Sequence, residues 1–228
     1  MTIGKYGVIY ADPPWRYERS AVQGAAEKHY PTMGIDELCA LPVADLAAPD
    51  SALFLWATFP QLPEALRLIQ SWGFTFKTVA FVWLKKNRKA DSWFYGLGFW
   101  TRANAEVCLL ATRGHPKRQA ANVHQFIISP IEGHSKKPDE ARDKIAALMG
   151  DVPRVELFAR QTPPGWDVWG NEVEPSPDLW TFCPEVRIEG APAKSADFVG
   201  RGAATERADS GCLRPEEHSG VCGDEKEV

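Results

Sequence analysis

Apolar runs and helix-like periods alternate along residues 1–174. The sequence predicts buried strands at 8–11, 51–56, 77–84, 105–112, 154–160 and 166–169, where short apolar runs are bounded by charged or turn-forming residues. It predicts helices at 34–38, 60–72 and 138–148; in the second of these, Leu62, Leu66 and Ile69 recur at helical spacing and Gly73 follows. This alternation favours an α/β fold with a doubly wound, mostly parallel sheet.

The first predicted strand ends in an acidic, proline-rich turn. Residues 6–15 read Y-G-V-I-Y-A-D-P-P-W, so Asp12 directly follows the apolar run. In open α/β sheets ligands bind beyond the carboxyl ends of the strands, and Pro13 and Pro14 make the turn stiff and leave its carbonyl groups free. The Asp12 carboxylate and the Pro13 carbonyl could accept both N–H bonds of an amino group, while Trp15 could stack on a planar base. Alternatively, Asp12 caps the next helix and Trp15 belongs to the core.

Basic and aromatic side chains interleave between the third and fourth predicted strands. Lys85, Lys86 and Arg88 precede a glycine-containing aromatic stretch that includes Trp100 and ends at Arg102. Cations that follow phosphates and rings that stack on bases are typical of binding to single-stranded or flipped nucleotides. The alternative is a solvated charge run followed by a packed aromatic hairpin.

Six short motifs resemble, in the same order, those of the adenine-N6 methyltransferases that use S-adenosylmethionine. This family includes the catalytic subunit of the eukaryotic messenger-RNA adenosine methyltransferase and many bacterial and phage proteins. The motifs are D-P-P-W at 12–15, Y-P-T-M at 30–33, F-L-W at 54–56, K-P-D-E at 137–140, E-L-F-A-R at 156–160 and W-D-V-W-G-N at 166–171. Together they cover roughly residues 5–174, and six in register are far more specific than one. The resemblance implies a Rossmann-like methyltransferase fold with a permuted order of motifs.

The resemblance also implies which residues carry the chemistry. Asp12 and the Pro13 carbonyl would align the adenine amino group for transfer, which makes D-P-P-W the catalytic motif. The catalytic set is Asp12, Pro13, Pro14 and Trp15, and the substrate-binding set is Tyr30, Lys85, Lys86, Arg88, Trp100, Arg102 and Glu106. In the second set, Tyr30 is expected as a second aromatic wall for the base, and Glu106 aligns with an acidic residue near the family's target site.

The cofactor is expected to be S-adenosyl-L-methionine. Lys137 aligns with the family lysine that reaches the methionine carboxylate, but Lys136 stands where the family usually has histidine, so either lysine could face that carboxylate. Asn171 and Glu172 resemble the pair that binds the ribose hydroxyls, the alternative being a simple turn. The expected cofactor-binding set is Asp12, Lys137, Glu156, Arg160, Gln161, Asn171 and Glu172.

Composition separates the end of the chain from the rest. The 228 residues carry 26 basic and 30 acidic side chains, and residues 175–228 hold 6 of the basic and 11 of the acidic ones. These residues lack a sustained apolar period and are rich in Gly, Pro, Ser and acidic residues. We therefore expect one methyltransferase domain at 1–174 and a disordered acidic tail at 175–228, with 179–188 packing onto the domain.

Other classes of protein are disfavoured by what the sequence lacks. The five cysteines and five histidines show no metal-ligand spacing, so no metal is expected. The dinucleotide motif G-x-G-x-x-G is absent, and no apolar run approaches the length of a membrane span. The predicted protein is a cytoplasmic enzyme that acts on nucleic acid.

The predicted reaction is methylation of the N6 amino group of adenine in DNA. DNA is preferred to RNA because the chain shows none of the additional RNA-binding or partner domains of the eukaryotic enzymes. The alternatives are the same reaction on RNA adenosine and a catalytically silent nucleic-acid-binding partner of the same fold. Transfer to a cytosine amino group or to a protein glutamine is disfavoured by the Trp of D-P-P-W and by the Y-P-T-M match.

Overall fold

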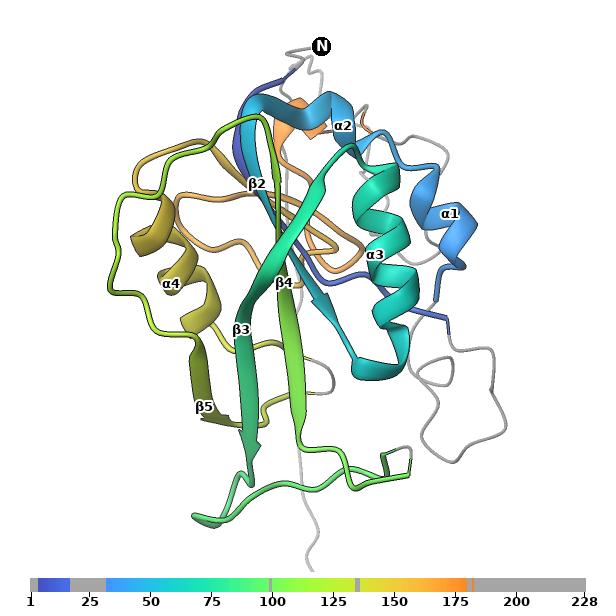
Figure 1. Cartoon of the computed structure of the whole chain (residues 1–228), viewed down its shortest axis with the longest axis vertical. Coiled ribbons are helices and arrows are strands. Elements are labelled where there is room, and N and C mark those ends of the chain that lie inside the picture. Colours follow the sequence, from blue (N-terminus) through green and yellow to red (C-terminus); the bar gives the residue numbers. More distant parts are fainter. Residues whose placement is uncertain (1–3, 17–31, 99, 134–135, 180–181, 183–228) are drawn as a thin grey trace, which may run out of the picture. The chain divides into compact units, whose positions relative to one another are not determined.

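A computed structural model describes residues 4–16, 32–98, 100–133, 136–179 and 182 (Figure 1). All of them belong to one compact unit, residues 1–192. This part contains a seven-stranded sheet in the order β5-β3-β4-β2-β1-β6-β7. The strands are β1 (Tyr6–Ala11), β2 (Ala47–Ala57), β3 (Thr75–Lys86), β4 (Ala105–Arg113), β5 (Phe126–Pro130), β6 (Arg154–Leu157) and β7 (Asp167–Trp169).

One strand of the described sheet runs against the others. β1 pairs in parallel with β2 and β6, and the pairs β6–β7 and β3–β5 are also parallel. β4 is antiparallel to both of its neighbours, β2 and β3. Its first residues, Ala105 and Glu106, therefore pair with Leu84 and Trp83 near the end of β3. The mostly parallel α/β sheet expected from the sequence is confirmed, and the reversed strand brings the start of β4 to the edge where β1, β2 and β3 end.

Helices cover both faces of the sheet. α1 (Ile35–Cys39), α2 (Val43–Leu46) and α3 (Leu62–Ser71) pack on one face, and α4 (Glu140–Met149) packs on the other (Figure 1). Side chains alternate between these two cores, as a strand buried on both faces requires. Leu53 and Leu55 point toward α3, whereas Phe54 and Trp56 point toward α4. None of the described helices is long and apolar enough to cross a membrane.

The elements predicted from the sequence are present, with shifted ends and four additions. The strand β5 and the one-turn helix α2 were not predicted, and two 3-10 turns, η2 (Phe59–Gln61) and η3 (Pro177–Leu179), also appear. Packing continues past residue 174: the Ser176 hydroxyl accepts a hydrogen bond from the Val168 N–H at 3.0 Å, and Leu179 is buried. The expected tail lies mostly outside the described residues, so its disorder stays a prediction.

Candidate active site

The D-P-P-W turn follows β1, which lies near the middle of the sheet. The N–H of Trp15 donates to the Pro13 carbonyl at 2.9 Å, and the N–H of Met33 donates to the Pro14 carbonyl at 2.8 Å. Trp15 and Met33 thereby form a short parallel bridge. The motif at 30–33 is thus attached to the proline turn, although Tyr30 itself lies outside the described residues. The Pro13 carbonyl already accepts one hydrogen bond and has a second lone pair for a substrate amino group.

Trp15 corrects one expectation from the sequence. Its side chain is only 6% exposed and belongs to the core that faces α1 and α3. Its indole N–H donates to the Trp56 carbonyl at 3.2 Å, which satisfies the polar atom of the ring inside the protein. The ring therefore anchors the proline turn to the core and does not offer the open face that stacking on a base requires.

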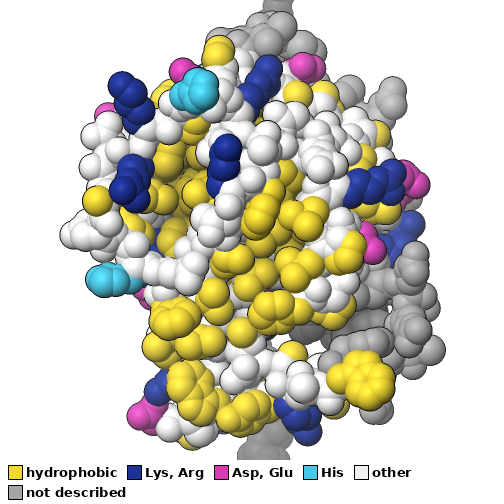
Figure 2. Space-filling view, in the orientation of Figure 1, with side chains coloured by type: hydrophobic (Ala, Val, Ile, Leu, Met, Phe, Trp, Pro, Cys, Tyr) yellow, Lys and Arg dark blue, Asp and Glu magenta, His cyan; other side chains and the backbone are white. Residues whose placement is uncertain are grey.

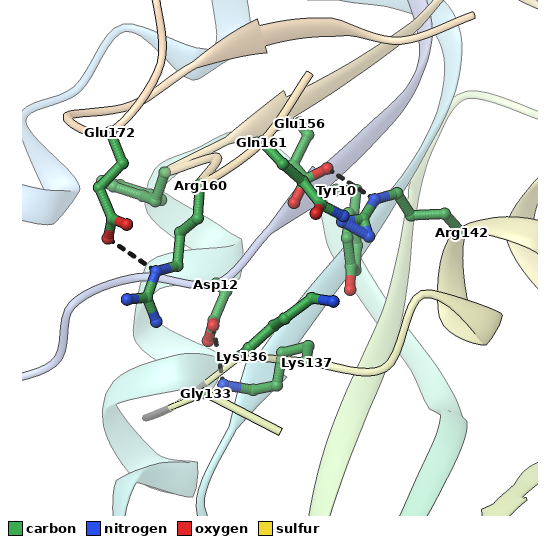
Figure 3. A pocket seen from close by; sticks show the side chains of 11 residues that line it. Tyr10, Asp12, Gly133, Lys136, Lys137, Arg142, Glu156, Arg160, Gln161 and Glu172 are labelled. Atoms are coloured by element: carbon green, nitrogen blue, oxygen red, sulfur yellow. Dashed lines mark hydrogen bonds and ion pairs between the residues drawn. The ribbon is translucent and has the colours of Figure 1, made fainter. Parts of the chain in front are cut away.

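Four charged side chains of alternating sign meet beside this turn, and we call them the interior charge cluster: Asp12, Lys137, Glu106 and Lys85. Lys137 Nζ lies 2.7 Å from Asp12 Oδ2 and 3.3 Å from Glu106 Oε2 (Figure 3 shows the first pair). Lys85 Nζ lies 2.5 Å from Glu106 Oε1. Lys137 also lies over the Trp56 ring, 5.8 Å from its centroid. Residues from four separate segments are thus joined into one network on the α4 side of the sheet.

Burial and neighbouring charges shift the pKa values in the interior charge cluster. Burial raises the pKa of Asp12, and the nearby Lys137 only partly offsets this effect. For Glu106 burial acts in the same direction, but the ammonium groups of Lys137 and Lys85 outweigh it and lower the pKa. Burial opposes the charge on Lys137, yet the Asp12 and Glu106 carboxylates raise its pKa above the ordinary value. Glu106 and Lys137 are therefore held in their charged forms, and Asp12 is the member that takes up a proton most readily.

A pocket opens beside Asp12 and Lys137. Its volume is about 200 Å³, and its walls come from the ends of β1 and β6, the segment before α4, and the turn after β7 (Figure 3). The residues that line it are Tyr10, Asp12, Gly133, Lys136, Lys137, Arg142, Glu156, Phe158, Arg160, Gln161 and Glu172. Six of the seven expected cofactor residues thus share one cavity; the seventh, Asn171, does not line it.

A buried ion pair forms one wall of this pocket. Arg142 Nε lies 3.0 Å from Glu156 Oε2, and an Arg142 Nη1 to Asp139 Oδ1 contact of 2.8 Å links the pair to the start of α4. Gln161 donates to the same Asp139 oxygen at 2.8 Å. Burial raises the pKa of Glu156 to about 7 although Arg142 lowers it. Arg142 was not singled out in the sequence; its spacing of three residues from Asp139 on a predicted helix is the signal that could have found it.

The two adjacent lysines have different partners. Lys137 faces Asp12, as described above, whereas Lys136 Nζ lies 2.5 Å from Glu132 Oε2 and 3.2 Å from Asp139 Oδ2. Both lysines line the pocket. Lys137 is therefore the lysine that touches the acid of the D-P-P-W turn, and Lys136 belongs to the rim.

The turn after β7 is held close to the end of β6. A Cβ on Gly170 would lie 2.2 Å from the Ala159 carbonyl oxygen, so only glycine fits there without a shift of the backbone. This close approach brings Glu172 to Arg160, whose Nε donates to Glu172 Oε1 at 2.7 Å (Figure 3). Asn171 lies in the same turn.

Residues 87–104 connect β3 to β4 and form the basic–aromatic loop. Contacts within the loop and its neighbourhood hold several of its cations: Arg102 Nε donates to the Gly96 carbonyl at 2.7 Å, and Arg88 Nε donates to the Ile131 carbonyl at 3.0 Å. Lys86, at the end of β3, pairs with Asp91 and lies over the Trp93 ring. Trp100 is fully exposed and has a positive φ of 69°. Hydrophobic and basic side chains lie together over this loop at the bottom of Figure 2.

The expected substrate residues within the described part of the chain therefore fall into two places. Glu106 lies inside between Lys137 and Lys85, whereas Arg88, Trp100 and Arg102 belong to the basic–aromatic loop and Lys86 pairs with a residue of that loop. The sequence grouped Lys85 with the cations of the loop, but in the structure its ammonium group donates to Glu106.

Comparison with known proteins shows the family to which the chain belongs. The MT-A70 family profile matches residues 6–172, which include β1, the proline turn, all the lining residues of the pocket and the turn after β7. The chain belongs to the MT-A70 family. This is a family of N6-adenine methyltransferases, and such enzymes use S-adenosylmethionine.

Relatives of the chain occur in bacteria and eukaryotes. It is 36% identical over 189 residues to the type II methyltransferase M.MunI of a Mycoplasma species, a match that covers 74% of this chain and 78% of the relative. It is 28% identical over 176 residues to the human N(6)-adenosine-methyltransferase catalytic subunit METTL3, and 29% identical over 174 residues to an MT-A70-like N(6)-adenosine-methyltransferase of Arabidopsis thaliana. These two matches cover 75% of this chain but only 29% and 24% of the relatives.

Proposed function

We propose that the protein transfers the methyl group of S-adenosylmethionine to the N6 amino group of adenine in DNA. The observation that carries this proposal is the contact of Asp12 with Lys137 in the wall of the pocket, at the carboxyl end of β1. Ligands of open α/β sheets bind at this edge. The acid that would hold the amino group thus adjoins the cavity that would hold the methyl donor.

The side chains that line the pocket fit the chemistry of this cofactor. Its methionine part carries a carboxylate and an ammonium group, and the pocket offers the cation of Lys137 and the carboxylate of Glu156. Its ribose carries two hydroxyl groups, for which Gln161 and Glu172 supply polar partners, and Phe158 supplies an apolar wall. Clefts with a few convergent polar groups are typical small-molecule sites.

The residues of this chain would align the reacting amine. When bound, S-adenosylmethionine supplies a methyl group attached to a positively charged sulfur, which keeps the electrons of the broken carbon–sulfur bond. The Asp12 carboxylate accepts a hydrogen bond from the adenine amino group, so that the nitrogen lone pair forms the new N–C bond. Its negative charge stabilises the positive charge that develops on nitrogen, and the nitrogen then loses a proton, which Asp12 can accept. Alignment of this kind contributes roughly 7–11 kcal/mol to rate enhancement.

The relatives favour DNA as the substrate. The match to the bacterial type II methyltransferase extends over most of that protein, whereas the relatives named as adenosine methyltransferases match over less than a third of their length. The basic–aromatic loop supplies cations and an exposed ring for a strand of either kind. RNA adenosine is the second candidate, because several relatives are named for it.

The test is an Asp12→Ala protein compared with Asp12→Asn. Each is incubated with S-adenosylmethionine and with DNA or RNA oligonucleotides that contain one adenine, and N6-methyladenine is measured by mass spectrometry. We expect Ala to reduce the turnover rate by about 10²–10⁴-fold and Asn to retain part of it, because its amide oxygen still accepts one hydrogen bond. Calorimetry should show that both variants bind the cofactor.

The outcomes separate the alternatives. Methylation of DNA by the wild type and loss in Asp12→Ala support the proposal, and exclusive methylation of RNA would move it to the second candidate. Full activity in Asp12→Ala would remove Asp12 from catalysis. A wild type that binds nucleic acid but neither binds the cofactor nor methylates would be a silent binding partner.

A further inference from the structure

Lys85 occupies a position unlike that of the other cations near it in the sequence. It lies on β3 two residues after Trp83, on the same face of the sheet, and its side chain is 17% exposed. Its ammonium group lies over the Trp83 ring, 4.8 Å from the centroid, and 2.5 Å from Glu106 Oε1. The next residue, Lys86, points the other way and pairs with Asp91 in the basic–aromatic loop.

Glu106 is the group that Lys85 holds. It is the second residue of β4 and the cross-strand partner of Trp83 on β3. Its side chain therefore lies on the same face of the sheet as those of Trp83 and Lys85. Its other oxygen faces Lys137, 3.3 Å away, and Asp12 lies beyond Lys137. Lys85 from β3 and Lys137 from the segment before α4 are thus the charges that face Glu106, with Asp12 of the proline turn behind them.

We propose that Lys85 is a positioning residue of the methyl-transfer site, which fixes the Glu106 carboxylate beside the Asp12–Lys137 pair instead of binding a nucleic-acid phosphate. This inference rests on the proposed function. It adds a residue that acts through Glu106 and does not itself touch the substrate.

The reason lies in how Lys137 is shared. The ammonium group of Lys137 already contacts the carboxylates of Asp12 and Glu106. The carboxylate of the bound cofactor would be a third anion that competes for it. A buried carboxylate that loses its cation takes up a proton or moves. Because Lys85 bonds to Glu106 independently of Lys137, it keeps Glu106 ionised and in place when Lys137 turns to the cofactor. The low pKa of Glu106 agrees with this arrangement.

The test compares Lys85→Met and Lys85→Arg with Lys89→Met, an exposed lysine of the same basic run. Two quantities are measured for each: the pH profile of kcat/KM, and the dependence of DNA affinity on salt concentration. For Lys85→Met we expect kcat to fall at least tenfold and the acid limb of the profile to move to higher pH, while the salt slope is unchanged. Lys85→Arg should return the acid limb to its position in the wild-type profile. Lys89→Met should leave the pH profile as in the wild type. It should reduce the slope of log affinity against log salt concentration by about 0.9, the value for one phosphate contact.

A double-mutant cycle with Glu106→Gln decides whether Lys85 acts through Glu106. In the Glu106→Gln background, adding Lys85→Met should have little further effect on kcat, and this comparison also holds if Lys85→Met alone folds poorly. The proposal is overturned if the two effects multiply, or if Lys85→Met reduces the salt slope and leaves the pH profile unchanged. A wild-type protein without methylation activity would instead contradict the proposed function. Failure of the proposed function is therefore distinguishable from failure of the role assigned to Lys85.

Discussion

The interior charge cluster and the basic–aromatic loop contain similar residue types in different surroundings. In the cluster, Lys85 and Glu106 are 17% and 16% exposed and each charge faces a partner of opposite sign. At the loop, Lys86 pairs with Asp91, whose side chain is 88% exposed. Adjacent lysines on one strand thus enter two electrostatic environments because successive side chains of a strand point to opposite faces. Removing one charge from the cluster should cost more stability than removing one at the loop, because it leaves a buried charge without its partner, whereas water screens the charges at the loop.

Removing the shared cation of the cluster should have the largest effect. Lys137→Met leaves the Asp12 and Glu106 carboxylates facing each other without their common partner. We expect the free energy of unfolding, measured by urea titration, to fall by about 3 kcal/mol and cofactor affinity to fall with it. Lys136→Met is the matched control at the rim, where a loss below about 1 kcal/mol is expected. Equal effects of the two changes would contradict the distinction between interior and rim.

The buried carboxylate of Glu156 should make stability depend on pH. Its pKa in the folded protein is about 7, above its ordinary value of 4.5, so its contribution to the unfolding free energy is fully present below pH 4.5 and is lost as the pH rises through 7. This pKa shift corresponds to a change of about 3 kcal/mol in the free energy of unfolding. Glu156→Gln cannot ionise, so the difference in unfolding free energy between wild type and variant should decline by that amount from pH 4.5 to 7.5. A difference that stays constant across this range would show that Glu156 titrates normally.

The exposed ring of the loop should matter for binding and not for folding. Trp100→Ala removes a fully exposed side chain, so the unfolding free energy should change by less than about 0.5 kcal/mol. Affinity for a single-stranded oligonucleotide, measured by fluorescence anisotropy, should fall roughly tenfold if a base stacks on the ring. Leu97→Ala, which removes another exposed apolar side chain of the loop, is the control and should leave affinity unchanged.

The smallest effect on stability is expected for cations at the loop. Replacing Lys86, Arg88 and Lys89 with Gln should leave the unfolding free energy within about 0.5 kcal/mol of the wild type. The same protein should bind nucleic acid more weakly and with a flatter salt dependence, by about 0.9 in slope for each lost contact with duplex phosphate. Unchanged affinity and slope would exclude these cations from the interface.

The sequence predicted the sheet and the pocket better than it predicted individual side-chain roles. Buried strands are local features that the sequence shows directly, and the resemblance of the motifs at their ends to the methyltransferase family implied that Asp12, Lys137, Arg160 and Glu172 share one site. The direction of β4 could not be deduced from its hydrophobic pattern, because that pattern is the same for a parallel and an antiparallel strand. A clue was present: residues 87–104 carry no helical period, and a parallel connection usually needs one.

Roles that depend on packing were harder to predict. Trp15 lies in a binding motif, yet the aromatic ring serves as an anchor because Trp56 and the core take up its surface. Lys85 lies in a basic run, yet strand alternation carries it inward. Arg142 belongs to no motif; its spacing from Asp139 was a weak signal in the sequence, and its contact with Glu156 follows only from the fold. Strand β5 was missed because five residues that end in proline are a weak pattern.

The reversed strand β4 has a consequence for how this protein can vary. Glu106 is held in register by pairing to β3 and by the β2 pairing of the residues after it, such as Val107 with Ala57. Residues 87–104 enter and leave the sheet at that same edge, so insertions or deletions there need not shift Glu106. Evolution could lengthen or rebuild this segment to suit a new nucleic-acid target while the acid beside it keeps its place.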